Sequence, residues 1–291
     1  MKVAVTGASG FIGRNILAEL EHHQVEVIAV TRDATRLQNI SNCVQVAEMD
    51  ISLPVEDTFE RLGCPDVLIH LAWDGLPNYK SLHHFESELP RQYCFLSKLI
   101  KDGLKNLFVA GTCFEYGMQS GALSASIKPQ PNNPYGYAKH ALHQQLEYLK
   151  KVSPYNLTWG RLFYMFGEGQ PGSSLYSQLK EAVMRGDKVF NMSGGEQLRD
   201  YLPVAKVARK IVTLVLTASD LGTVNICSGS PVSVRRLVEQ WLPENGWEIE
   251  LNFGHYPYPE YEPMAFWGDR LLQDSIETNI IDFPPLVNTR Q

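Results

Sequence analysis

A tyrosine and a lysine near the middle of the chain have the spacing of a proton-transfer pair. In the stretch NNPYGYAKHALHQQLEYLKK, Tyr135 precedes Lys139 by four positions, so the two share one face of a helix. Tyr137 lies about 200° round the axis from Lys139 and is predicted not to reach it. A neighbouring ammonium group lowers the pKa of a tyrosine hydroxyl, which is otherwise a poor base at neutral pH. The same spacing at Tyr176 and Lys180 falls in the second half of the chain, and it is predicted to be structural.

A glycine-rich loop opens the chain. Gly7, Gly10 and Gly13 form a GxxGxxG pattern in TGASGFIG, directly after the apolar run KVAVTG and at the start of a helical pattern. Glycines at such a turn let backbone N–H groups approach a pyrophosphate at the helix N-terminus. The alternative is a tight turn without a ligand. We predict a dinucleotide site, and its contacts in this loop are Gly7, Ser9, Gly10, Phe11, Ile12 and Gly13.

The end of the second apolar run, AVTRDATR, bears on the choice of cofactor. An acidic residue there would bind the ribose hydroxyls of NAD, whereas an arginine suits the 2′-phosphate of NADP. Thr31 occupies the acidic slot, and Arg32 and Arg36 follow it. NADP(H) is therefore favoured, with NAD(H) possible. Asp50 could accept from the adenine amino group or cap the next segment. The other cofactor contacts expected in this half are Ile51, Leu71 and Ala72, together with Tyr135 and Lys139.

The totals exclude several classes of protein. The chain has 291 residues, 44% of them hydrophobic, and a formal net charge of −6, without the basic stripe that nucleic-acid binding needs. No apolar run approaches the roughly 20 residues that cross a bilayer. The five cysteines are scattered without a CxxC pair, and neither adjacent histidine pair has a metal-binding spacing. These features predict a cytoplasmic protein with free thiols, no membrane partner and no metal.

Alternation of apolar strands and helical patterns indicates the fold. Strand-like runs at 2–6, 26–32, 43–51, 65–73, 105–112 and 156–163 are separated by amphipathic segments. This alternation is typical of parallel strands joined by helical crossovers. We predict an α/β fold with a doubly wound, Rossmann-type parallel sheet over residues 1–165 and a smaller substrate-binding lobe over 166–291. Thr112 ends the fifth strand at the carboxyl edge, where its hydroxyl could hold a substrate oxygen.

Seven motifs in order resemble the extended short-chain dehydrogenase/reductases. They are TGASGFIG, HLAW, GTCFEYG, PYGYAK, RLFYMFGEGQ, RDYLPV and VNICSG. The nearest branch comprises the NAD(P)-dependent sugar-nucleotide epimerases, dehydratases and 4-ketoreductases. The resemblance implies that Thr112, Tyr135 and Lys139 form the catalytic triad and that Lys139 also holds the nicotinamide ribose. It further implies that Arg199 contacts the diphosphate of a nucleotide sugar.

Departures from the family pattern narrow the reaction. Cys113 and Phe114 stand where the dehydratases of this family have an aspartate and a glutamate, so dehydration is disfavoured. Phe114 also stands where members that epimerise before reducing have a cysteine. Tyr164 replaces a common asparagine. The residues expected to contact substrate are Trp73, Asp74, Thr112, Cys113, Phe114, Tyr164 and Arg199.

What remains is hydride chemistry on a dTDP-, UDP- or GDP-linked sugar. We expect an NADP(H)-dependent reductase of a 4-keto-6-deoxyhexose, in the manner of relatives that make deoxyhexoses such as dTDP-6-deoxy-L-talose for surface polysaccharide. An NAD-dependent 4-epimerase is the enzymatic alternative, and an NADP-binding redox sensor or scaffold is the non-enzymatic one. The family often dimerises through the helices near 87–102 and 137–151. Because the second of these has apolar residues beyond one stripe, we expect a homodimer; they are Leu142, Leu146 and Leu149.

Overall fold

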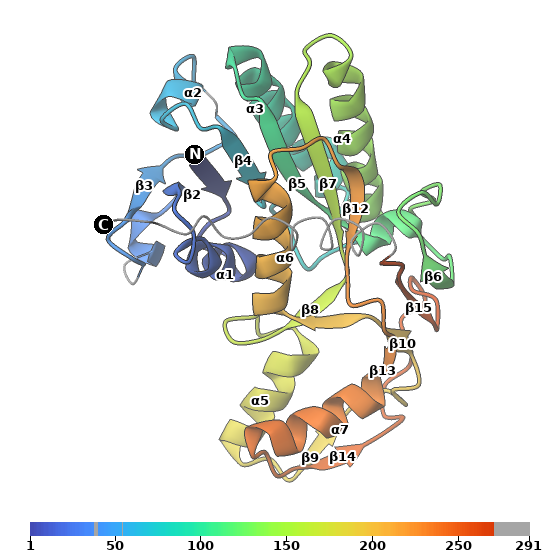
Figure 1. Cartoon of the computed structure of the whole chain (residues 1–291). Coiled ribbons are helices and arrows are strands. Elements are labelled where there is room, and N and C mark those ends of the chain that lie inside the picture. Colours follow the sequence, from blue (N-terminus) through green and yellow to red (C-terminus); the bar gives the residue numbers. More distant parts are fainter. Residues whose placement is uncertain (38–39, 54, 271–291) are drawn as a thin grey trace, which may run out of the picture.

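Seven parallel strands form the central sheet of the computed structural model, which describes residues 1–37, 40–53 and 55–270. The strand order is β3-β2-β1-β4-β5-β7-β12 (Figure 1). Every residue of β4 is buried, which is expected of a parallel strand covered on both faces. The predicted doubly wound parallel sheet is confirmed. The strands are β1 (Lys2–Thr6), β2 (Glu26–Thr31), β3 (Val44–Glu48), β4 (Val67–His70), β5 (Asn106–Thr112), β7 (Asn156–Leu162) and β12 (Gly222–Ile226).

Two pairs of helices cover the sheet. Helices α1 (Phe11–Leu20) and α6 (Val204–Leu216) lie on the near face in Figure 1, and they share a core with β1 and β2. Helices α3 (Leu89–Asp102) and α4 (Pro134–Lys150) cover the other face. Short helical segments lie in the connections: η1 (Ala34–Leu37), α2 (Thr58–Arg61), η2 (His84–Glu88) and η3 (Cys113–Tyr116).

The strand order reverses between β1 and β4. From β1, the next two strands in the sequence, β2 and β3, are added on one side. The following strand, β4, is added on the other side of β1. In such sheets a ligand binds outside the carboxyl ends of the strands at this switch point. The glycine loop follows β1, and Thr112 is the last residue of β5, so the predicted cofactor and catalytic residues belong to the same edge.

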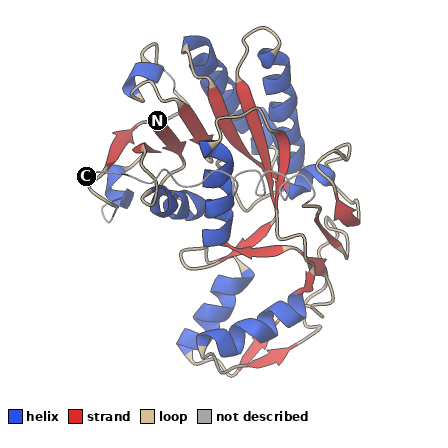
Figure 2. Ribbon diagram, in the orientation of Figure 1, coloured by secondary structure: helices blue, strands red, loops and turns tan. Residues whose placement is uncertain are grey.

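A smaller lobe lies at one end of the molecule (Figure 2). Its core is formed by side chains from both of its longer helices, including Tyr176, Leu179, Val238 and Trp241. Tyr176 therefore packs as a core residue, in line with its predicted structural role, and Lys180 pairs with Glu168. The lobe elements are α5 (Leu175–Arg185), β9 (Val189–Asn191), α7 (Val234–Asn245) and β14 (Glu250–Asn252).

Three short strand pairs join the lobe to the sheet domain. Each pair brings together two segments that are far apart in the chain. The pairs are β8 (Tyr164–Phe166) with β11 (Tyr201–Pro203), β10 (Leu198–Arg199) with β13 (Val232–Ser233), and β6 (Gly121–Leu123) with β15 (Phe266–Gly268).

The expected boundary at residue 165 does not match the sheet. Strand β12 pairs with β7 along the edge of the large sheet, although it lies well beyond that boundary. Helix α6 packs against α1, because its apolar face of Val207, Ile211 and Val212 completes the core on that side. The chain thus returns to the sheet domain after its first excursion into the lobe. The expected lobe also includes residues 271–291, which lie outside the described residues.

Three further expectations can be compared with the structure. Leu142, Leu146 and Leu149 are all buried against the sheet, so they are core residues and not a spare apolar stripe. The exposed aromatic residues of α4 are Tyr137 and Tyr148.

Each of the five cysteines lies in the described part of the chain and is a free thiol. Within the described residues, no helix has both the length and the apolar character that a membrane span requires.

Candidate active site

The glycine loop is shaped for close approach of a ligand to the backbone. Gly7 has φ +68°, and a Cβ there would lie 2.9 Å from the backbone nitrogen of Ala72. A Cβ on Gly13 would lie 2.3 Å from the carbonyl oxygen of Gly7, so this glycine lets α1 pack against the loop. Gly10 is the N-cap of α1, and no side chain of a described residue caps that end. The N–H groups of the first turn can therefore bind an anion such as a pyrophosphate.

A cleft of about 310 Å³ lies beside this loop. Its walls come from the carboxyl ends of β1, β2 and β4, the segment after β3 and the start of α3. The predicted Phe11, Ile12 and Gly13 do not line it, since they belong to α1 behind the loop. Eleven predicted residues do line it: Gly7, Ser9, Gly10, Arg32, Arg36, Asp50, Ile51, Leu71, Ala72, Trp73 and Asp74. The cleft suits the adenosine and pyrophosphate parts of a dinucleotide.

The charged rim of the cleft combines predicted and unpredicted groups. Arg32 is exposed and lies 4.0 Å from the Asp74 carboxylate. The carboxylate of Asp33 accepts from the backbone and hydroxyl of Thr35, which lower its pKa and turn it toward its own loop. The neutral Thr31 hydroxyl donates to Ser9 Oγ at 3.1 Å. Because Arg32 is exposed and lines the cleft, its guanidinium can bind the 2′-phosphate of NADP.

Asp50 caps a turn, as one of its two predicted roles required. Its Oδ1 accepts from the backbone N–H of Ser52 at 2.9 Å, and this hydrogen bond is the main cause of its lowered pKa. The carboxylate also lines the cleft, so a contact with adenine stays a prediction.

The end of η2 and the first turn of α3 contribute cleft residues that the sequence reading missed. Glu88 is buried, and its Oε1 accepts from Asp74 N at 3.1 Å and from Gln92 Nε2 at 2.5 Å. Arg91 also lines the cleft. The only available signal was a run of polar residues at the start of a helix that follows a buried strand. Such a run is also what a solvated helix end would show.

Helix α4 presents Tyr135 and Lys139 to the interior and Tyr137 to solvent. Asn133 caps the helix by accepting from Gly136 N at 2.8 Å, and Pro134 occupies the first turn. Tyr135 is 8% exposed and Lys139 is 1% exposed, whereas Tyr137 is 55% exposed. The structure therefore agrees with the prediction that Tyr135, not Tyr137, shares a face with the lysine.

Lys139 is fixed by β5 and by an indole ring. Its Nζ donates to the carbonyl oxygen of Ala110 at 2.8 Å and lies 3.9 Å from the centre of the Trp73 ring. The Trp73 nitrogen in turn donates to Nδ1 of His84 at 3.1 Å. Burial lowers the pKa of Lys139 to about 7, and the negative charges of Glu115 and Glu88 act against that shift. Trp73 thus contacts Lys139 as well as lining the nucleotide cleft.

The pKa of Tyr135 departs from expectation. The sequence reading expected the lysine ammonium to lower it, but burial raises it well above its usual value. Aromatic rings crowd the phenol: Trp73 at 6.0 Å, Tyr79 at 5.6 Å and His84 at 5.2 Å between ring centres. A hydrogen bond with Thr112 acts in the lowering direction. Desolvation outweighs these local contacts, so Tyr135 is a protonated phenol at neutral pH.

Thr112 begins a short helical turn at the end of β5. Its Oγ1 accepts from Phe114 N at 3.3 Å, which leaves the hydroxyl proton free to be donated. Cys113 is buried in an apolar cluster, and burial raises the pKa of its thiol, so it is a packing residue. Phe114 lies 4.8 Å from Tyr79 between ring centres. Neither side chain can supply the acid or base that water elimination needs.

Arg199 is less available than the sequence suggested. It is 2% exposed, and its NH2 group donates to Glu262 at 2.9 Å. Its NH1 group donates to the carbonyl oxygens of Leu198 and Met264. In this conformation Glu262 occupies the NH2 side of the guanidinium, where it would compete with a diphosphate. The sequence reading missed Glu262, whose negative charge raises the pKa of several nearby tyrosines.

Tyr164 lies near this ion pair. Its ring centre is 5.9 Å from the Arg199 guanidinium and 5.2 Å from the Tyr201 ring. Among the described residues its inaccessible hydroxyl has no hydrogen-bond partner.

One group of side chains resembles a metal site by distance alone. Donor atoms of Glu115, His140 and His143 lie within 4.8 Å of one another. The Glu115 carboxylate, however, already accepts from Arg161 Nε at 3.0 Å, and that guanidinium opposes a divalent cation. Glu115 is therefore the partner of a buried arginine, and this ion pair accounts for its place in the group.

The fold and the site together define a class. A dinucleotide cleft at the switch point of a doubly wound sheet, beside a buried Tyr–Lys pair, is the arrangement of a nicotinamide-dependent oxidoreductase. The chain matches the NAD dependent epimerase/dehydratase family over residues 3–227, and it belongs to that family. The predicted family and enzyme class are confirmed.

Relatives of known name support this placement. The chain is 30% identical over 270 residues to dTDP-6-deoxy-L-talose 4-dehydrogenase (NAD(+)) of Aggregatibacter actinomycetemcomitans, covering 92% of this chain and 99% of the relative. It is 27% identical to GDP-6-deoxy-D-talose 4-dehydrogenase of the same organism, covering 82% and 78%. A solved structure of MoeE5 with UDP-glucuronic acid and NAD superposes with a TM-score of 0.78 at 26% identity, covering 95% and 93%.

Proposed function

We propose that this enzyme reduces the 4-keto group of a nucleotide-linked 4-keto-6-deoxyhexose with NADP(H). The observation that carries the proposal is the buried pair of Tyr135 and Lys139, joined by Thr112 at the carboxyl end of β5. The neighbouring Cys113 and Phe114 offer neither acid nor base, so hydride and proton transfer remain as the chemistry. At neutral pH the Tyr135 phenol holds its proton, which is the form that can give a proton to a ketone oxygen.

Each residue then has a definable task. The glycine loop and the cleft beside it would hold a nicotinamide dinucleotide, which when bound would supply the hydride. Tyr135 gives its hydroxyl proton to the carbonyl oxygen of the substrate. Thr112 donates its own hydroxyl proton in a hydrogen bond to the same oxygen and so orients it. Lys139, as an ammonium, stabilises the phenolate that Tyr135 leaves behind.

The sugar class rests on the named relatives. Two of them act on 6-deoxytaloses, one linked to dTDP and the other to GDP. We therefore place a dTDP-linked 4-keto-6-deoxyhexose first and UDP- and GDP-linked sugars after it. The product would be a deoxyhexose donor for surface polysaccharide. The test is to mix the purified protein with NADPH and each 4-keto sugar and to follow absorbance of the reduced nicotinamide.

The alternatives give different results in that assay. Stoichiometric loss of NADPH with one sugar is expected. A 4-epimerase would interconvert hydroxyl epimers without net cofactor consumption, and this activity is measured by chromatography of the same nucleotide sugars. Cofactor binding without either reaction would contradict both enzymatic readings and leave a sensor or scaffold.

The cofactor choice gives a separate prediction. Arg32→Ala is expected to lower kcat/KM for NADPH about tenfold relative to NADH, because the variant loses a charge-assisted contact with the 2′-phosphate. Steady-state kinetics with both cofactors measures the ratio. Arg185→Ala is the matched control, since Arg185 is an exposed arginine paired with Asp187 in the lobe. A wild-type enzyme that prefers NADH would contradict the NADP assignment and agree with the name of the first relative.

Arg199 carries a prediction about substrate binding. We propose that the substrate diphosphate takes the place of Glu262 on the Arg199 guanidinium. Arg199→Met is then expected to raise KM for the nucleotide sugar at least about tenfold, with a smaller effect on kcat, because a buried charge contact is lost. Arg235→Met is the control, since that exposed arginine pairs with Glu239. Equal KM values in the variant and the wild type would remove Arg199 from the substrate site.

A homodimer remains part of the proposal. In this dimer a second copy of the chain would pack against α3 and α4. The exposed Tyr137 and Tyr148 of α4 would then lie in the interface. Light scattering of the purified protein should give about twice the chain mass of 32.8 kDa. A monomer mass across the concentrations used in the assay would contradict it.

A further inference from the structure

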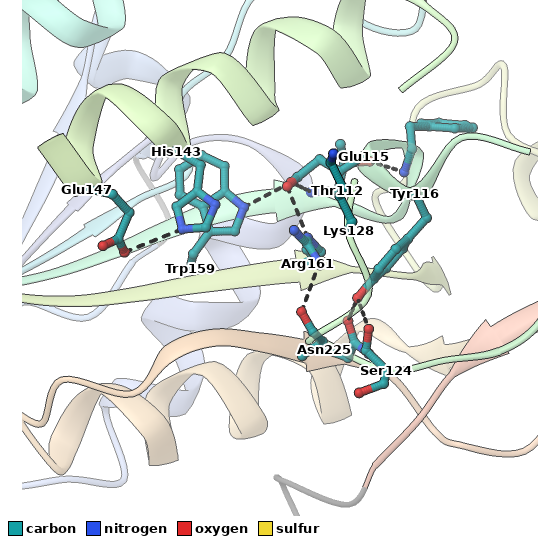
Figure 3. Close-up of polar contacts among 12 residues, drawn as sticks. Thr112, Glu115, Tyr116, Ser124, Lys128, His143, Glu147, Trp159, Arg161 and Asn225 are labelled. Atoms are coloured by element: carbon teal, nitrogen blue, oxygen red, sulfur yellow. Dashed lines mark hydrogen bonds and ion pairs between the residues drawn. The ribbon is translucent and has the colours of Figure 1, made fainter. Parts of the chain in front are cut away.

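A buried carboxylate lies directly behind the catalytic turn (Figure 3). Glu115 is 0% exposed, and its Oε1 accepts from the backbone N–H of Thr112 at 2.9 Å. The same oxygen accepts from the Trp159 indole nitrogen at 2.9 Å, and Oε2 accepts from Arg161 Nε at 3.0 Å. The carboxylate therefore joins Thr112, the N-cap of η3, to Trp159 and Arg161 on β7.

The backbone is shaped to admit this carboxylate. A Cβ on Gly111 would lie 2.6 Å from Glu115 Oε1 and 2.3 Å from the Trp159 indole nitrogen. Only a glycine before Thr112 leaves room for both groups. Arg161 is held on its other side by the carbonyl oxygen of Ala125, and its guanidinium lies 4.6 Å from the centre of the Tyr116 ring.

Burying a full charge here is costly unless it is paired. An amide or a hydroxyl could accept from Thr112 N without that cost, so hydrogen bonding alone does not require a carboxylate. The ionic partner, Arg161, is 2% exposed and equally buried. The negative charge of this ion pair belongs to Glu115 in η3, and the positive charge belongs to Arg161 in β7.

The negative charge acts on the catalytic pair. Glu115 raises the pKa of both Lys139 and Tyr135. The second carboxylate facing Lys139 is Glu88 of η2, which acts in the same direction. The imidazoles of His70 on β4 and His84 on η2 also face the lysine, and both have lowered pKa values, so they are neutral. Glu115 is therefore one of two carboxylates that favour an ammonium at Lys139.

We propose that Glu115 is a positioning residue for the reaction: its carboxylate fixes the main chain of Thr112 and supplies a buried negative charge that favours the ammonium form of Lys139. The inference rests on the proposed function for its catalytic meaning. The charge relation between Glu115 and Lys139 can nevertheless be measured without turnover.

Two variants separate charge from shape. Glu115→Gln keeps an acceptor for Thr112 N and removes the charge, which leaves Arg161 uncompensated. Glu115→Gln with Arg161→Gln removes both charges and restores neutrality. Ketone reduction needs both Tyr135 and Lys139 protonated, so kcat should fall as pH rises through their pKa values. In Glu115→Gln we expect this falling limb to move about one pH unit lower. In the double variant it should move back toward the wild-type position.

A structural role alone would give another pattern. Both variants would then lose kcat evenly across pH, the double variant would be the worse of the two, and the limb would stay in place. That result would overturn the proposal. Retention of a folded core is checked by thermal unfolding of each variant.

A second measurement is independent of activity. In protein with ¹³Cε-labelled lysine, the Lys139 resonance is the one that disappears in Lys139→Met, and its NMR titration gives the pKa directly. The midpoint should be about one unit lower in Glu115→Gln than in the wild type. An equal midpoint in the two proteins overturns the inference, even if the reductase is confirmed. Conversely, absence of turnover in the wild type contradicts the proposed function and leaves the titration result standing.

Discussion

Tyr135→Phe is expected to lower kcat for reduction of the 4-keto sugar by about a thousandfold, which is within the range for loss of a general acid. The variant keeps the aromatic ring that packs with Trp73, Tyr79 and His84, so the pocket retains its shape. Cofactor binding should change less than about threefold, because the phenol hydroxyl lies in a different part of the site from the glycine loop. Stopped-flow or steady-state absorbance gives kcat, and titration of the tryptophan fluorescence gives the cofactor affinity.

The same helix offers a matched control for this prediction. Tyr137 lies two residues further on and is exposed, and its nearest described ring is Phe85 at 6.0 Å. Tyr137→Phe removes an identical hydroxyl from α4 and should leave kcat near the wild-type value. If Tyr135→Phe retained more than about a tenth of wild-type turnover, the proton would have to come from another group.

Lys139→Met is expected to have opposite effects on activity and stability. Turnover should fall at least about a hundredfold, because the phenolate of Tyr135 would lose its counter-charge and the nicotinamide ribose would lose its proposed contact. The folded protein should become more stable at neutral pH, because the variant no longer buries an ammonium group beneath the Trp73 ring. Thermal unfolding and steady-state kinetics on the same preparations test both halves. Lys101→Met on the exposed end of α3 is the control.

The stability gain should depend on pH. Burial lowers the pKa of Lys139 from 10.5 to about 7 in the folded protein. Between these values the unfolded chain binds a proton that the folded protein does not bind, so wild-type stability rises with pH across this window. The advantage of the methionine variant is therefore largest below pH 7, at most about 5 kcal/mol. It should shrink toward pH 10, where the lysine is neutral in the folded protein. A constant difference in Tm from pH 6 to pH 10 would contradict the lowered pKa.

The parts of the site that could be predicted from sequence are local. The strand before Gly7 and the helix after it fix the loop, and the four-residue spacing of Tyr135 and Lys139 fixes their common face. Both features depend on a few adjacent residues and on regular backbone geometry. Thr112 could be placed at the carboxyl edge for the same reason, since it ends a buried strand.

The features that could not be predicted depend on distant segments. The raised pKa of Tyr135 results from crowding by Trp73, Tyr79 and His84, which come from the connection after β4. Glu262 reaches Arg199 from 63 positions along the chain. No spacing rule relates such residues, because their contact exists only after the sheet, α4 and the lobe have assembled.

The return of the chain from the lobe to the sheet has a consequence for protein engineering. The lobe core takes Tyr176 and Leu179 from one excursion of the chain and Val238 and Trp241 from another, and α6 and β12 lie between the two. A chimera that grafts the lobe of a relative to change sugar specificity must therefore exchange two separate segments together. A single crossover would join half of one lobe to half of another and leave both halves of the core mismatched.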